Sequence, residues 1–86
     1  MKKYLYVFMG GPGTDSEKTR CVFHCQKYDQ IVVGVSSIEN AIEVGKEFAK
    51  QGVESVELCA YFNNEKKDTV EKGLKGKIRV GAVRFD

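Results

Sequence analysis

The sequence predicts an α/β domain: a small, mostly parallel sheet of four or five strands with a βαβαβ core, covered by two or three helices. Two segments are apolar on both faces, as strands of parallel sheets are. A third segment has the period of an amphipathic helix. Short links join the elements in alternation, which is typical of right-handed parallel crossovers. Residues 1–86 are expected to form a single domain.

The first two expected strands are residues 4–9 and 31–35, both continuous apolar runs. Such runs predict strands that are buried on both faces. The first run ends at residues 10–13, where three glycines permit positive φ and a proline removes a backbone donor.

Residues 15–26 allow two interpretations. A capping-box pattern beginning at Thr14 would start a short helix that runs to about His24. Residues 21–26 would equally form a strand that turns back into the strand near Ile31. Short apolar runs cannot be separated by period alone, and we favour the helix.

The best-defined helix is expected to begin at Ser36, where Ser36 and Glu39 form a capping box, and to end at Gly52 in the left-handed conformation. A third strand is expected over residues 53–60. A more polar helix would run from Asn63 or Asn64 to about Leu74, followed by a last strand over residues 77–85. The first helix would face the sheet with Ile38, Ala41, Ile42, Gly45, Phe48 and Ala49.

Composition argues against several classes of function. The net charge is only +2, and lysines are interleaved with glutamates, so no nucleic-acid partner is expected. No segment is long enough to span a membrane, and the apolar run after the N-terminal lysines is too short for a signal peptide. Three cysteines are expected to be reduced thiols in the cytoplasm. Core packing is the expected role of Tyr4, Tyr6, Phe8, Phe23 and Phe85.

Polar residues and glycines follow each expected strand. In an open parallel sheet, ligands bind outside the carboxyl ends of the strands. Two helix N-termini would open at that edge, and their free amides favour an anion. We therefore expect a small acidic ligand or anion to bind here, with Arg84 gripping its acidic group. The expected ligand-binding residues are Gly11, Gly13, Ser36, Ser37, Asn63 and Arg84.

The alternative is a small enzyme at the same edge. Cys59 would be a nucleophile activated by a helix N-terminus, with His24 the only histidine available as its base. Glu57 would serve instead as a general base. Cys21, His24, Cys25 and Cys59 would share a zinc ion only if residues 21–25 were helical, and they lack paired C-x-x-C spacing. No metal or cofactor is predicted, since no nucleotide-binding glycine motif is present.

Three segments carry a resemblance: residues 32–35, residues 56–59 with the letters VELC, and residues 80–86 with the letters VGAVRFD. They resemble a family of small prokaryotic proteins known only as a domain of unknown function. The E-L-C and V-R-F-D segments are its more specific parts. Members typically follow E-L-C with two glycines, where this chain has Ala60 and Tyr61. The resemblance implies the domain limits and the α/β class, and no activity. More loosely, residues 31–83 look like consecutive β/α units of a phosphate-binding TIM-type barrel, although the chain is too short to close one.

A sheet this small would leave edge strands and an apolar surface without helices. We therefore expect a homo-oligomer, by default a homodimer. A third hypothesis follows, in which the protein is an interaction module whose oligomer surface is its function.

Overall fold

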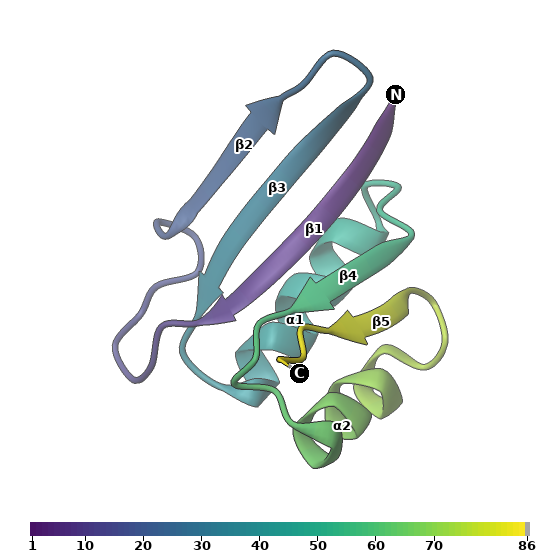
Figure 1. Cartoon of the computed structure of the whole chain (residues 1–86). Helices are drawn as coiled ribbons and strands as arrows, with labels where there is room; N and C mark the ends of the chain where they lie inside the picture. The colour runs from purple at the N-terminus through teal and green to yellow at the C-terminus, as the bar shows by residue number, and fades with distance from the viewer. Residues whose placement is uncertain (86) are drawn as a thin grey trace.

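The structure, a computed structural model, describes residues 1–85 as a five-stranded sheet and two helices (Figure 1). The strands are β1 (Lys2–Met9), β2 (Arg20–His24), β3 (Tyr28–Val35), β4 (Ser55–Leu58) and β5 (Arg79–Ala82). The helices are α1 (Ile38–Ala49) and α2 (Asn64–Leu74). Neither helix has the length and apolar content needed to cross a membrane.

The strand order across the sheet is β2-β3-β1-β4-β5. β1 runs parallel to both of its neighbours, β3 and β4, and β4 runs parallel to β5. β2, at one edge, is antiparallel to β3. The predicted α/β class and the mostly parallel sheet are therefore confirmed. Strand, helix, strand, helix and strand follow one another from β3 to β5, although β1 lies between β3 and β4 in the sheet.

The helix favoured for the segment before β3 is wrong, because that segment contains β2. Asp15 forms a tight turn in which its side chain accepts the N–H of Glu17 at 2.9 Å. Its carbonyl oxygen accepts the N–H groups of Lys18 and Thr19. The polar groups of the capping-box pattern thus close a local turn, which is the common alternative to a helix for such residues. The following residues pair with β3, which satisfies backbone groups along that strand.

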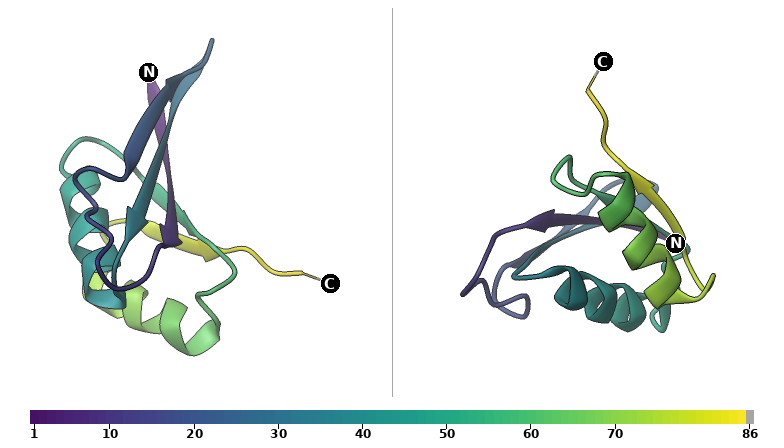
Figure 2. Two further views of the ribbon diagram at one scale, coloured as in Figure 1. Left: turned by 90° about the vertical axis from the view of Figure 1, so that its left-hand side faces the viewer. Right: turned by 90° about the horizontal axis from the view of Figure 1, so that it is seen from below.

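Both helices cover one side of the sheet, so the molecule has two layers (Figure 2). Along β1, Leu5 and Val7 face the helices and are buried, whereas Tyr4 and Tyr6 face the other side. β3 and β4 alternate in the same register. The core between the layers is Leu5, Val7, Ile31, Val33, Val35, Ala41, Val44, Phe48, Val53, Val56, Leu58, Phe62, Val70, Leu74 and Ile78.

The side of the sheet without helices is here called the open face. Its strands were expected to be buried on both faces, but helices cover only one. Tyr4, Phe23 and Phe85 are 39%, 53% and 86% exposed, so core packing is the wrong role for these three rings. The alternation along the strands and their register define the open face as Lys2, Tyr4, Tyr6, Phe8, Cys21, Phe23, Tyr28, Gln30, Val32, Gly34, Ser55, Glu57, Arg79 and Gly81.

The helix ends correct one prediction and agree with another. α1 is capped by Ser37 and not by Ser36: the Ser37 hydroxyl accepts the N–H of Asn40 at 3.0 Å. Asn40 reaches back and accepts the N–H of Ser36, which Glu39 was expected to do. The pair of contacts resembles a capping box shifted by one residue, except that the returning side chain accepts the N–H of the residue before the cap. α2 is capped by Asn63, as predicted.

Candidate functional site

The carboxyl ends of β1, β3, β4 and β5 lie at one edge of the sheet because these four strands are parallel. A hollow of about 600 Å³ opens at this edge, between the loop after β1 and the start of α1. Three of the residues expected to bind a ligand, Gly11, Ser36 and Ser37, line it. The remaining lining residues are Met9, Pro12, Ile38, Glu39 and Tyr61.

Backbone amides are the main donors that this edge hollow offers. The first turn of a helix leaves N–H groups without helical partners. Within residues 1–85, the N–H groups of Ser37, Ile38 and Glu39 have no hydrogen-bond acceptor, and neither does that of Gly11. Four unpaired amides thus belong to residues that line one hollow. The positive end of the α1 dipole lies at the same place.

Two charged groups modify this environment. The side chain of Glu39 lines the edge hollow and brings a carboxylate to the first turn of α1. Tyr61 forms a wall, 48% exposed, and the Lys66 ammonium lies 3.9 Å from the centre of its ring. The lysine therefore supplies a cation behind the aromatic wall, opposing the charge of Glu39.

The other residues expected to bind a ligand do not line the hollow. Asn63 is occupied as the cap of α2, since its side chain accepts the N–H of Lys66 at 3.0 Å. Arg84 donates to the side chain of Asn64 at 2.9 Å and to its neighbour's carbonyl at 2.8 Å. Gly13 has a φ of 91° in the turn that follows β1. These three residues lie outside the lining of the edge hollow.

Cys59 and Glu57 lie near each other, and both lie near Tyr6. The Cys59 sulfur accepts the N–H of Met9 at 3.4 Å, which holds the thiol at the end of β1. Burial raises the pKa of the Tyr6 hydroxyl above its usual value, and the charges of Cys59 and Glu57 raise it further. The three side chains form a small polar cluster at the carboxyl end of the open face.

His24 is not part of this cluster. It bonds to Asp29 at 2.9 Å, and Asp29 lies beside Lys3 near the amino end of β1. Six residues of β1, or about 20 Å, separate that end from Met9. The structure therefore leaves the Cys59 thiol without an imidazole base.

The chain matches a family of unknown function, DUF6506, over residues 2–86. The chain belongs to this family. No curated protein matches it, and no solved structure does.

In this DUF6506 domain, two of the three segments that carried the resemblance, residues 56–59 and 80–86, are neighbours in the sheet. Glu57 of the E-L-C segment is beside Gly81, and Leu58 is beside Ala82. The N–H of Val83 donates to the carbonyl of Leu58 at 2.9 Å, extending the contact beyond β5. Asp86, the end of the V-R-F-D segment, lies outside the described residues.

The zinc interpretation needed a helix around Cys21, and this segment is a strand. Cys21 and His24 consequently point to opposite faces of the sheet. Among residues 1–85, no three His, Cys, Asp or Glu side chains gather closely enough to hold a metal ion.

Sequence analysis missed Lys66 and did not place Glu39 in a site. The spacing of five residues between Tyr61 and Lys66 crosses a loop and a cap, so no periodic pattern connects them. Glu39 was assigned to a capping box with Ser36, and its position in the first turn was the available signal for a place at the edge.

A second hollow, of about 400 Å³, lies where the C-terminal parts of α1 and α2 meet. Its floor is apolar, with Leu74 at its base, and no carboxylate lines it. Four lysines surround it: Lys46, Lys50, Lys75 and Lys77. This lysine hollow would compete for any anion, although lysines near helix C-termini also serve simply to balance the helix dipoles.

Proposed function

We propose that this DUF6506 chain binds a small molecule with one acidic group in the edge hollow. The observation that supports it is the set of unpaired amides at Ser37, Ile38 and Glu39, beside an exposed aromatic wall. An acidic oxygen would accept from these amides, as anions do at helix N-termini. The apolar part of the ligand would pack against Tyr61.

The charges around the hollow favour a singly charged acid over a multiply charged one. Glu39 repels an anion from the same turn that attracts it, and its carboxylate already complements the helix dipole. Lys66 offsets part of this repulsion from behind Tyr61. A carboxylic acid with a flat apolar group, such as benzoate, suits these surroundings better than a phosphate ester does.

A thermal-shift screen of benzoate, small organic acids and phosphorylated sugars tests the proposal. Glu39→Gln should tighten binding about fivefold by removing about 1 kcal/mol of repulsion. Tyr61→Ala should weaken it. Glu43→Gln, one turn further along α1, is the matched control and should leave affinity unchanged.

Lys46→Gln identifies binding at the competing lysine hollow. If the ligand-induced shift survives Tyr61→Ala and Glu39→Gln unchanged but disappears in Lys46→Gln, the edge hollow is not the site. Absence of any shift across the screen would also contradict the proposal.

The proposal includes the setting in which the protein works. We infer a reducing, cytoplasmic environment, in which Cys21, Cys25 and Cys59 remain thiols. We also infer a homo-oligomer, because the open face leaves aromatic side chains uncovered.

A small enzyme at Cys59 or Glu57 is the second candidate. The polar cluster with Tyr6 supports it, because a hydroxyl held neutral beside a thiol and a carboxylate would donate a proton to a substrate. Alkylation of the Cys21→Ser/Cys25→Ser protein by iodoacetamide measures the reactivity of Cys59. A Cys59 thiol that reacts no faster than free cysteine at pH 7 would remove this candidate.

A further inference from the structure

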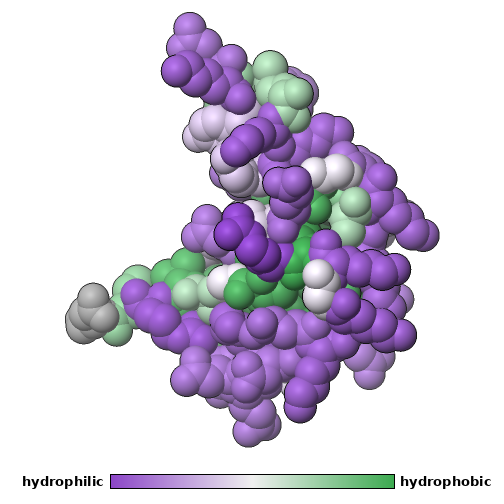
Figure 3. Space-filling model, turned by 90° about the vertical axis from the view of Figure 1, so that its right-hand side faces the viewer, coloured by the Kyte–Doolittle hydropathy of each residue, from purple (hydrophilic) through white to green (hydrophobic). Residues whose placement is uncertain are grey.

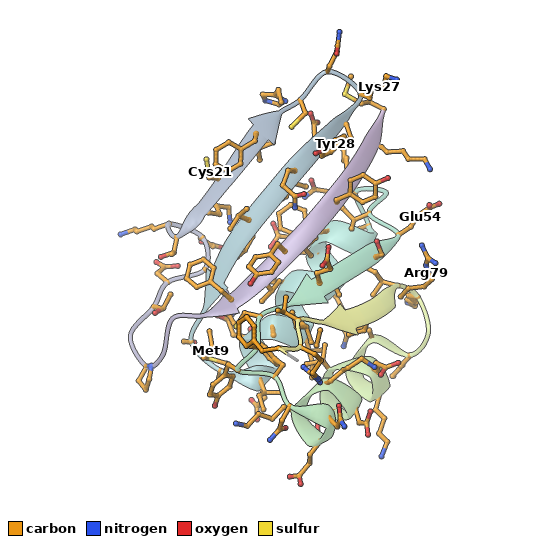
Figure 4. All side chains as sticks on the ribbon, viewed as in Figure 1. Met9, Cys21, Lys27, Tyr28, Glu54 and Arg79 are labelled. Atoms are coloured by element: carbon orange, nitrogen blue, oxygen red, sulfur yellow. The ribbon has the colours of Figure 1, made fainter. Side chains whose placement is uncertain are left out.

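The open face carries uncovered aromatic side chains. Figure 4 looks onto it, with Cys21, Tyr28 and Arg79 labelled on β2, β3 and β5. Tyr4 and Tyr28 lie near its amino end, 39% and 37% exposed, with their rings edge to face at 5.2 Å. Phe23 extends the aromatic surface onto the edge strand β2.

Three charged side chains lie on the open face: Lys2, Glu57 and Arg79. Within residues 1–85, Glu57 and Arg79 have no ion-pair partner. Glu57 is beside Gly81 on the neighbouring strand, and Arg79 precedes Gly81 by two residues. With strands about 4.8 Å apart and a rise of about 3.3 Å per residue, the two positions lie about 8 Å apart. Long side chains can span this distance, but the structure does not pair the two within one protomer.

We propose that a second copy of this chain packs against the open face about a two-fold axis, with Glu57 of each protomer paired with Arg79 of the other. A two-fold axis that lies in a surface and is the perpendicular bisector of the line between two residues carries each onto the position of the other. One such axis therefore makes two Glu57–Arg79 pairs at once, which is the self-complementarity that an isologous dimer requires.

The position of this axis is set by the two charges, and it leads to the exposed tyrosines. From the β4–β5 boundary the axis is directed diagonally towards the amino ends of β1 and β3, where Tyr4 and Tyr28 lie. The two tyrosines of one protomer would face the same two tyrosines of its partner, so an aromatic centre lies between the ion pairs.

The surroundings of Arg79 suit an incoming carboxylate. A hollow of about 250 Å³ at the amino end of the sheet is lined by Lys2, Lys3 and Arg79 with one acid, Glu54. Tyr4 and Ser55 complete the part of this hollow that belongs to the open face. With three cations against one carboxylate, this hollow has a net positive charge that would attract the carboxylate of the partner's Glu57.

The tail, residues 83–85, projects from the open side of the molecule (Figure 2) and would block many face-to-face arrangements. In Figure 3 the surface is hollowed between the tail and the amino end of the sheet. Because the proposed axis starts next to β5, each tail would lie at the β5 edge of the partner and flank it instead of colliding with it.

The area available predicts a weak dimer. Five strands about 4.8 Å apart and about 20 Å long present about 500 Å², so two such faces bury at most about 1,000 Å², and less because the diagonal axis leaves the carboxyl ends of β1 and β3 outside the contact. Stable specific interfaces bury more, about 1,200–2,000 Å². We therefore expect dissociation in the micromolar range. The axis leaves the edge hollow uncovered, so the dimer and the ligand proposal are tested separately.

Sedimentation velocity from about 1 to 500 µM tests the dimer. Glu57→Arg and Arg79→Glu should each weaken association about a hundredfold, because each change replaces two attractions with two repulsions. The doubly reversed protein, Glu57→Arg with Arg79→Glu, should regain association to within about tenfold of the unchanged protein. Asp68→Arg, an equal charge change on exposed α2, is the matched control and should have no effect. Circular dichroism confirms that each variant is folded.

Rescue by the double reversal is the result that a non-specific aromatic contact would not give. A chain that stays monomeric at 500 µM overturns the proposal. So does a dimer that neither single reversal weakens, or one that the double reversal fails to restore, because each would place the interface elsewhere or leave the face to another partner.

Discussion

Gly45 lies in the middle of α1 where that helix packs against α2, and the structure leaves little room for a methyl group there. A Cβ on Gly45 would lie 2.8 Å from Cδ2 and 3.1 Å from Cδ1 of Leu74. Carbon atoms normally pack about 3.5–4.0 Å apart. Leu74 is 2% exposed, so its side chain cannot turn into solvent without losing its core contacts. In Gly45→Ala, the steric cost of the added methyl group therefore acts against the better helix propensity of alanine.

Both terms can be given a size. Alanine in place of glycine inside a helix stabilises by about 1 kcal/mol. Overpacking a buried contact costs about 1–3 kcal/mol. Gly45→Ala should therefore change the free energy of unfolding by between nothing and a loss of about 2 kcal/mol. Leu74→Ala removes the obstructing carbons, and in that background Gly45→Ala should instead stabilise by about 1 kcal/mol.

Urea unfolding of the four proteins in this cycle measures the effect. Leu74→Ala alone should cost about 2–5 kcal/mol, against about 4–13 kcal/mol expected for a chain of this length. Lys46→Ala, the next residue on the exposed side, controls for general effects on α1. If Gly45→Ala stabilises equally with and without Leu74, the two helices do not approach as closely as described.

Three further outcomes follow from single contacts. Phe62 is fully buried, so Phe62→Ala should lower the free energy of unfolding in urea by about 3–5 kcal/mol. Asn63→Ala removes the cap of α2 and should cost about 1 kcal/mol in thermal unfolding, whereas Asn64→Ala, which loses only a contact to an exposed side chain, should cost much less. The pKa of Tyr6 is raised in the folded protein, so the stability that the neutral hydroxyl contributes is complete below pH about 10 and is lost as the pH rises further. Urea unfolding at pH 9 and 11 should therefore show a smaller loss of stability for Tyr6→Phe than for the unchanged protein.

The period of apolar residues was sufficient to predict α1 and α2, and the alternation of elements predicted the direction of most strands. The stripe on α1 identified the side that faces the sheet, although it omitted Val44, which is 2% exposed. It failed for β2, because the Asp15 turn uses the same residue types as a helix cap. Apolar residues on both faces of β1 predicted burial on both sides. A strand that is covered on only one side can have the same pattern, and the period of apolar residues alone does not separate these two cases.

The edge hollow was predictable in position but not in composition. Parallel strands bring Gly11 and Ser37 to one edge, and this followed from strand order along the chain. Arg84 was expected there too, yet the tail leaves the sheet beyond β5 and its guanidinium bonds to Asn64. The residue pattern after β5 does not specify the direction in which the chain leaves the sheet.

The uncovered sheet and the edge hollow answer different physical needs of a small domain. A chain of 86 residues has enough helix to cover one side of five strands, so its second side needs either polar side chains or a partner. The open face has only three charged residues, which are too few for the first solution, and it leaves large aromatic rings exposed. Two of the three charges, those of Glu57 and Arg79, are complementary. The edge hollow, by contrast, is polar through backbone amides, which no second copy of the open face would satisfy. The proposed self-association and the proposed ligand binding would therefore use separate surfaces, and a variant that abolishes one should leave the other intact.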